Sequence, residues 1–271
     1  MSIVEQLCRE LAEEQESLDS VVSGLSAEEW SRPTPAAGWD VLDSLSHLCF
    51  FDEAAALSVR DPELFVAQRD GLIRSMAAAA DGATPDVALG RGLGDPSRLV
   101  QRWRAARSGY ITSVLAADRR AAEAGERLRV EWYGPAMSPA SFTTARLMET
   151  WAHGVDIRDA LGVATVATPR LRHVCHIGYG ARAYSFAAHG VEDPGDPVRL
   201  EVQAPDGGLW AWGPEDATDR ITGTALEVAL MFTQRRSLGH TAIDVTGPVA
   251  QLWLSIAQAF AGPPTVTAPD R

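Results

Sequence analysis

Residues 138–162 constrain the fold most, because they predict a single long helix with both ends marked. Ser138 can cap the first turn, Pro139 suits the first helical position, and Gly162 ends the helix. Apolar residues at helical spacing predict further helices in the same half of the chain, at residues 3–22, 41–51, 61–80 and 96–117. Helices joined by loops of varied length predict an antiparallel four-helix bundle over residues 1–165.

Capping and breaking residues mark the connections of this half. Ser26 and Glu29 form a capping-box pattern. Residues 32–38 hold two prolines and a glycine, and Asp40 behind them can cap the next helix. The stretch 81–95, rich in Gly, Asp and Pro, predicts a loop.

Residues 166–271 change character and predict a small α+β domain, so the fold class is α plus α+β. Val198–Val202 alternates as a strand does, and residues 209–212 read as its hairpin partner across a Gly-containing turn at 205–208. The remaining predicted elements are helices at 169–190, 222–236 and 248–260 and a strand at 241–245.

Composition excludes several functions. With 24 basic and 36 acidic residues, the net charge of −12 disfavours nucleic-acid binding. The sequence has no apolar run long enough to span a membrane and no basic amphipathic helix for a membrane surface, and its first residues do not resemble a secretory signal. Cys8, Cys49 and Cys175 are isolated, which predicts free thiols in a reducing compartment, the cytoplasm.

Three side chains of the helical half predict a metal site. Glu149 and His153 are four residues apart and therefore share one face of the long helix. His47, on the helix capped by Asp40, can supply a third ligand, and carboxylate with imidazole suits zinc. Three protein ligands with an open position is the pattern of catalytic sites. The alternative for Glu149 and His153 is an ordinary surface contact, although their neighbours on that face are largely apolar.

Two segments carry a family resemblance. Residues 38–48 hold Gly-Trp before the helix with His47, and residues 149–156 hold the pattern E-x-x-x-H-x-x-D. Both resemble the signature segments of the DinB-like superfamily, and more closely the branch that contains mycothiol-dependent maleylpyruvate isomerase. Residues 166–271 are similar to the sterol-carrier-like second domain of that branch, through the segments 222–227, 234–235 and 245–247. An actinobacterial subfamily described only as metal-binding is more similar still.

The resemblance implies a fold, a site and a reaction class. It implies a DinB-like bundle over residues 1–165, with His47, Glu149 and His153 binding zinc, or alternatively nickel, and with water or substrate at the fourth position. It also implies mycothiol as a thiol cofactor and an isomerase or S-transferase reaction on a small electrophilic substrate. The expected partners are that small molecule and, at most, a second copy of the chain, as a monomer or homodimer.

Two further residues are candidates for the site. Asp156 lies three residues after His153 and could orient a ligand, or it could be a surface acid that pairs with Arg158 or Arg182. The resemblance implies that Arg235 faces a cleft between the domains and binds a substrate carboxylate; the alternative is a solvated helix end. His173 and His176 could be general acids or bases, or ordinary hydrogen-bonded histidines.

Other functions fit the same scaffold, because a fold does not determine a reaction. One alternative is a cyclase or lyase of secondary metabolism. Another is a non-enzymatic protein that binds a metal or an apolar ligand. Dependence of turnover on a thiol distinguishes the first interpretation from the second, and a ligand bound without conversion favours the third.

Overall fold

The structure, a computed structural model, describes residues 1–77, 90–91 and 95–262. The chain divides into two compact units, Met1–Ala164 and Thr165–Arg271. None of the helices in this part of the chain combines the length and the apolar character that crossing a bilayer requires.

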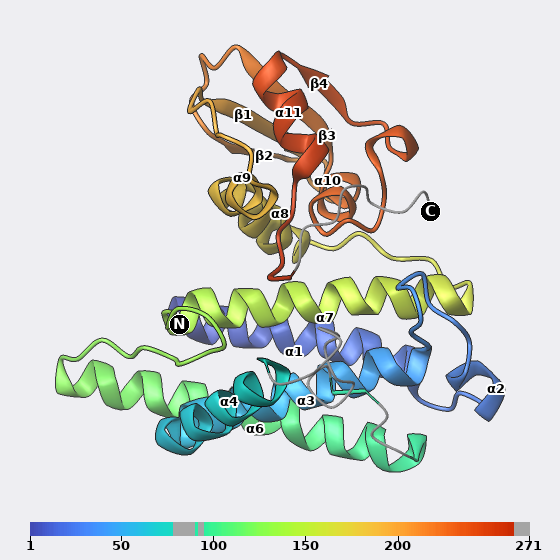
Figure 1. The fold of residues 1–271 in the computed structure, drawn as a ribbon, viewed down its shortest axis with the longest axis vertical. Coiled ribbons are helices and arrows are strands. Elements are labelled where there is room, and N and C mark those ends of the chain that lie inside the picture. Colours follow the sequence, from blue (N-terminus) through green and yellow to red (C-terminus); the bar gives the residue numbers. More distant parts are fainter. Residues whose placement is uncertain (78–89, 92–94, 263–271) are drawn as a thin grey trace. The chain divides into compact units, whose positions relative to one another are not determined.

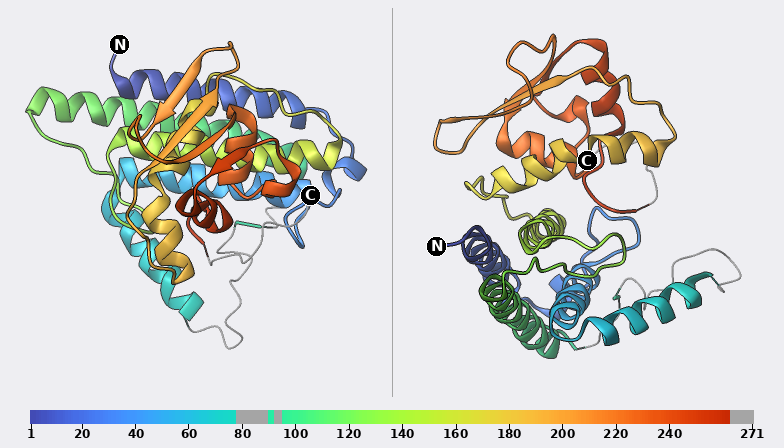
Figure 2. Two further views of the ribbon diagram at one scale, coloured as in Figure 1. Left: turned by 90° about the horizontal axis from the view of Figure 1, so that it is seen from above. Right: turned by 90° about the vertical axis from the view of Figure 1, so that its left-hand side faces the viewer.

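The first unit is helical, as predicted. Its long helices are α1 (Ile3–Val22), α3 (Val41–Arg60), α6 (Pro96–Ala124) and α7 (Pro139–Leu161), and its shorter ones are α2 (Ala27–Trp30) and α4 (Pro62–Ala77). Both α1 and α3 pack against α6 and α7. Figure 1 shows these four helices side by side, and the right-hand view of Figure 2 shows them nearly end-on. Fully buried side chains from all four helices meet in the core: Leu18, Leu45, Trp103 and Ile157.

The helix starts follow the sequence signals closely, but two helices end later than predicted. Helix α3, predicted over residues 41–51, continues to Arg60. Ser138 accepts a hydrogen bond at the start of α7, and Gly162 ends it with a φ of 71°. Helix α6 was predicted to end at residue 117 but continues to Ala124, where Gly125 has a φ of 69°. The added turns consist of Ala, Arg, Asp and Glu, which favour helix or suit its exposed surface but show no apolar spacing.

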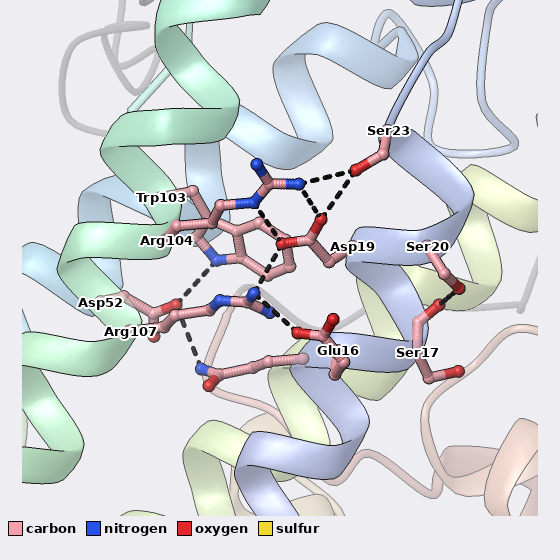
Figure 3. A network of polar contacts seen from close by, with 10 residues as sticks. Glu16, Ser17, Asp19, Ser20, Ser23, Asp52, Trp103, Arg104 and Arg107 are labelled. Carbon is pink, nitrogen blue, oxygen red and sulfur yellow. Dashed lines mark hydrogen bonds and ion pairs between the residues drawn. The ribbon is translucent and has the colours of Figure 1, made fainter.

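An ion-pair network joins α1 to α6 (Figure 3). Asp19 is 3% exposed and accepts hydrogen bonds from Arg104 at 2.5 and 2.8 Å, from Arg107 at 2.5 Å and from Ser23 at 2.8 Å. The Arg104 hydrogen bonds are the main cause that lowers the pKa of Asp19 below its ordinary value of 3.8. The carboxylate therefore stabilises the folded chain when it is ionised.

This network predicts a pH dependence of stability. A lowered pKa contributes stability above the unfolded-state value, and the contribution is lost as the pH falls through the lower folded-state value. The free energy of unfolding should therefore fall more steeply below about pH 4 in the parent than in Asp19→Asn. Chemical denaturation across pH 2 to 7 (approximately) measures both curves. Parallel curves would show that the ion pairs of Asp19 with Arg104 and Arg107 do not stabilise the folded chain.

The second unit contains a mixed four-stranded sheet with helices, ordered β2-β1-β3-β4. The strands are β1 (Val198–Gln203), β2 (Leu209–Trp212), β3 (Asp219–Thr224) and β4 (Asp244–Thr246). Only β1 and β3 pair in parallel among these strands, with Leu200 opposite Ile221. The helices are α8 (Leu171–Gly180), α9 (Arg182–His189), α10 (Ala225–Phe232) and α11 (Pro248–Ile256), with a 3-10 turn η1 at Leu238–His240. Alternate residues of β1 are buried, as expected for a sheet with one covered face.

Several predicted elements of this unit are wrong in their extent. Residues 222–224 belong to β3 rather than to a helix, and α10 begins only after Thr224, whose side chain caps it. The predicted helix 169–190 is two helices that meet at Ala181. Two smaller corrections concern the strand at 241–245, which begins at Asp244, and the helix at 248–260, which ends at Ile256. The loop predicted at 81–95, in the first unit, lies mostly outside the described residues.

Candidate metal centre

Helix α3 presents the first candidate ligand, His47. A tight turn precedes the helix: Gly38 has a φ of 76°, a conformation that suits glycine, and Trp39 follows it. The side chain of Asp40 then accepts a hydrogen bond from the backbone N–H of Asp43 at 2.7 Å and caps α3. The cap fixes where the helix begins, and therefore the turn on which His47 lies.

Helix α7 presents the other two candidates, Glu149 and His153. They lie one turn apart, with 3.7 Å between Glu149 Oε2 and His153 Nε2. The rings of His47 and His153 are 4.6 Å apart, so α3 and α7 face each other here. One ligand atom from each of the three half-buried side chains lies within 4.8 Å of the others, an arrangement found once among the described residues. Two imidazole nitrogens and one carboxylate oxygen fit a borderline divalent cation such as zinc.

Asp156 lies next to this group. Its side chain is fully buried, and its Oδ2 is 3.7 Å from His153 Nδ1. Asp156 is therefore not the surface acid that the alternative interpretation expected. The two nitrogens of His153 face different carboxylates, Nε2 towards Glu149 and Nδ1 towards Asp156. A cation bound between Nε2 and Glu149 would leave the ring proton on Nδ1, beside Asp156.

Aromatic rings surround the two histidines. The ring of Trp39 is stacked 6.0 Å from His153 and lies 5.2 Å from His47 at a steep angle. Phe51, one turn after His47 on α3, packs 4.6 Å from the His47 ring. Phe51 was not predicted at the site. Phe51 was open to prediction, because a four-residue spacing places it on the same helix face as His47.

Arg91 is a second residue that sequence reasoning missed at this position. Its guanidinium lies 5.2 Å from the centre of the Trp39 ring and donates hydrogen bonds to Gly38 O at 2.6 Å and Asp43 Oδ2 at 2.9 Å. These contacts hold the turn that carries Trp39. Arg91 comes from a region distant in sequence, so no local pattern pointed to it.

The other candidate residues lie in the second unit. Arg235 follows the C-terminal end of α10, is half-buried and donates a hydrogen bond to Thr233 O at 2.7 Å. The preceding residue, Gln234, is the only described non-glycine residue with a positive φ, 59°. His176 is exposed and accepts a hydrogen bond from Trp212 Nε1 at 3.2 Å, while His173 is half-buried on the same helix, α8.

The chain's own thiols are not available as nucleophiles. Cys8, Cys49 and Cys175 are all buried, at 2% exposure or less, and free. Burial raises the pKa of Cys8 to about 11 and the pKa of Cys49 and of Cys175 to about 12. A thiolate that reacts at this protein at neutral pH is therefore expected to come from another molecule.

We expect the folded protein to resist alkylation. At pH 8 a thiol with a pKa of about 11 is ionised to only about one part in a thousand, and burial also blocks the reagent. Iodoacetamide should therefore label no cysteine in the native chain during a period that labels all three in guanidinium, as counted by intact-mass spectrometry. A cysteine labelled at the rate of a free thiol in the native chain would contradict its burial.

Comparisons with known proteins agree with this architecture. A solved structure of the mycothiol-dependent maleylpyruvate isomerase matches with a TM-score of 0.55 at 14% identity, covering 91% of this chain and 93% of that one. A mutant of the same enzyme matches with a TM-score of 0.56, again at 14% identity, covering 91% of this chain and 95% of that one. At this identity the likeness shows the fold alone.

Sequence comparisons find relatives of higher identity. Uncharacterized proteins of Mycobacterium tuberculosis strains CDC 1551 / Oshkosh and ATCC 25618 / H37Rv are each 40% identical over 255 residues, 94% of this chain and 95% of the relative. Residues 11–158 match the model of the mycothiol maleylpyruvate isomerase N-terminal domain, and this range holds His47, Glu149, His153 and Asp156. The chain therefore belongs to the mycothiol maleylpyruvate isomerase N-terminal domain family.

Proposed function

We propose that this protein is a metal-dependent enzyme of thiol-linked chemistry, an isomerase or S-transferase that uses mycothiol on a small electrophilic substrate. The cluster of His47, Glu149 and His153 carries the proposal, because it offers three ligands and no fourth protein ligand among the described residues. The names of the family and of the enzyme with a similar fold support the choice of thiol and reaction class.

Zinc, or alternatively nickel, would be held by His47, Glu149 and His153. Such a cation supplies Lewis acidity, which lowers the pKa of a bound thiol so that the thiolate is present at neutral pH. The buried cysteines of the chain cannot take that role, so the thiol is a cofactor rather than a side chain.

The chain's own residues prepare this site. We assign to Asp156 the role of orienting the His153 imidazole, whose Nδ1 lies 3.7 Å from Asp156 Oδ2. Trp39 and Phe51 cover the histidine rings with apolar surface, which excludes water and strengthens charge interactions at the ligands. We assign to Arg235 the binding of a substrate carboxylate, through the planar guanidinium.

The finer assignments belong to the same proposal. We place the first unit in the DinB-like bundle family and the second among sterol-carrier-like α+β domains. The partners are a small-molecule substrate and, at most, a second copy of the chain, with neither nucleic acid nor membrane involved, and the location is the cytoplasm.

A thiol-dependence assay tests the function. Zinc-loaded protein is incubated with maleylpyruvate-like electrophiles, with and without mycothiol, and products are followed by nuclear magnetic resonance. Product that forms only with mycothiol, and not with the His153→Ala variant, is the expected result. Turnover that needs no thiol favours a cyclase or lyase, whereas a bound but unchanged ligand favours a binding protein.

A further inference from the structure

A buried carboxylate, Asp52, lies where side chains of all four long helices of the first unit meet. Its Oδ1 accepts hydrogen bonds from Arg146 Nε at 3.1 Å and Nη2 at 2.8 Å. Its Oδ2 accepts one from Trp103 Nε1 at 3.0 Å, drawn in Figure 3, and one from Gln15 Nε2 at 3.5 Å. Asp52 is 0% exposed and Arg146 is 4% exposed, so this ion pair is fully inside the bundle.

The ion pair joins the two helices that present the candidate ligands. Asp52 lies on α3 with His47, and Arg146 lies on α7 with Glu149 and His153. Residue numbers rise on α3 as they fall on α7 between these two contacts, so the helices run antiparallel, as Figure 1 also shows.

The two contacts have matched spacings along the helices. Asp52 lies five residues after His47 on α3. On α7, Arg146 lies five residues before the midpoint of Glu149 and His153. Five residues correspond to about 7.5 Å along a helix. The rise between the ion pair and the ligand cluster is therefore the same on both helices. One alignment of α3 against α7 brings both sets of residues together.

We propose that Asp52 and Arg146 are positioning residues that set the register of α3 against α7 and thereby bring His47 opposite Glu149 and His153. This inference rests on the proposed function in one respect, that these three side chains bind a metal. Neither Asp52 nor Arg146 is assigned a role in the chemistry itself.

An ion pair fixes the alignment of two helices more strictly than apolar contacts do. Apolar side chains tolerate a shift of one helix along another, because other apolar surface replaces the lost contact. A shift of one residue, about 1.5 Å, would break the paired hydrogen bonds between Arg146 and Asp52 and leave buried charges without partners. A buried polar pair therefore penalises wrong registers more than it stabilises the right one.

Metal affinity, measured separately from folding, tests the proposal. The double variant Asp52→Leu/Arg146→Met replaces the ion pair with apolar side chains, an exchange that proteins often tolerate in stability. It also removes the acceptor of Trp103 Nε1 and Gln15 Nε2, so folding is checked beside affinity. Its dissociation constant for zinc is measured by competition with a chromophoric chelator, at a temperature where circular dichroism shows the native helix content. We expect binding weaker than in the parent by on the order of tenfold or more.

Two further variants keep the test decisive. Asp19→Asn weakens an ion-pair network between α1 and α6, helices that carry none of the three ligands, and should leave zinc affinity unchanged. Arg146→Lys keeps the charge but loses the two-point contact, and should weaken zinc binding severalfold in a folded chain.

The failures of the two proposals are distinguishable. Parental affinity in the folded double variant, or in Arg146→Lys, would overturn the positioning role while leaving the metal site intact. A parent protein that binds no zinc, nickel or cobalt would overturn the metal site, and the positioning proposal with it. An equal loss in Asp19→Asn would attribute the effect to general destabilisation and would likewise overturn the positioning role.

Discussion

Replacing His153 with alanine is expected to abolish metal binding while the chain stays folded. Elemental analysis by mass spectrometry should find about one equivalent of zinc or nickel in the parent and close to none in His153→Ala. The variant loses one of three candidate ligands and leaves Glu149 and His47 on separate helices, too few to hold the ion tightly. Glu149→Gln, which keeps the size of the side chain but removes its charge, should also weaken binding strongly.

The fold should survive because His153 is half-buried and the core of the unit consists of apolar side chains from four helices. The matched control is His176→Ala, another helical histidine outside the cluster, which should keep the parental metal content. Circular dichroism of the parent and the three variants checks that helix content is unchanged. Full metal occupancy in His153→Ala would show that the ligand assignment is wrong.

The elements of the first unit were largely predictable because their signals are local. Capping side chains such as Ser138 and the left-handed Gly162 end helices through contacts within one turn. The second unit was harder, because β3 pairs in parallel with β1, a strand distant in sequence, and Ile221 is its only large apolar residue. The last three residues of this strand, 222–224, were therefore assigned to the helix that follows it.

The candidate site was likewise predictable in its local features but not in its contacts between distant residues. Periodicity alone placed Glu149 and His153 on one helix face, and their role as ligands with His47 stays a prediction. The contact of His47 with His153 joins residues more than a hundred positions apart, so it depends on helix register, which the resemblance implied and the residue pattern could not show. The contact of Arg91 with the Trp39 turn also joins residues distant in sequence, so no local pattern could show it.

Trp103 supplies the second large effect that we expect. It is 0% exposed, and its indole N–H donates a hydrogen bond to Asp52 Oδ2 at 3.0 Å. Trp103→Ala should lower the free energy of unfolding by about 4 kcal/mol, through the cavity and the lost apolar burial. Urea titration measures the loss, and amide hydrogen exchange in α6 assigns it to the first unit.

A second tryptophan separates the hydrogen bond from the packing. Trp253 on α11 is also 0% exposed, but no acceptor among the described residues lies within hydrogen-bond distance of its indole nitrogen. Phenylalanine removes similar volume at both positions, but only at Trp103 does it remove a hydrogen bond to a buried carboxylate. Because a hydrogen bond to a charged group contributes about 2 kcal/mol, Trp103→Phe should cost about that much more than Trp253→Phe. Equal losses would mean that the indole hydrogen bond does not stabilise Asp52, and that the four-helix junction depends on the ion pair with Arg146 instead.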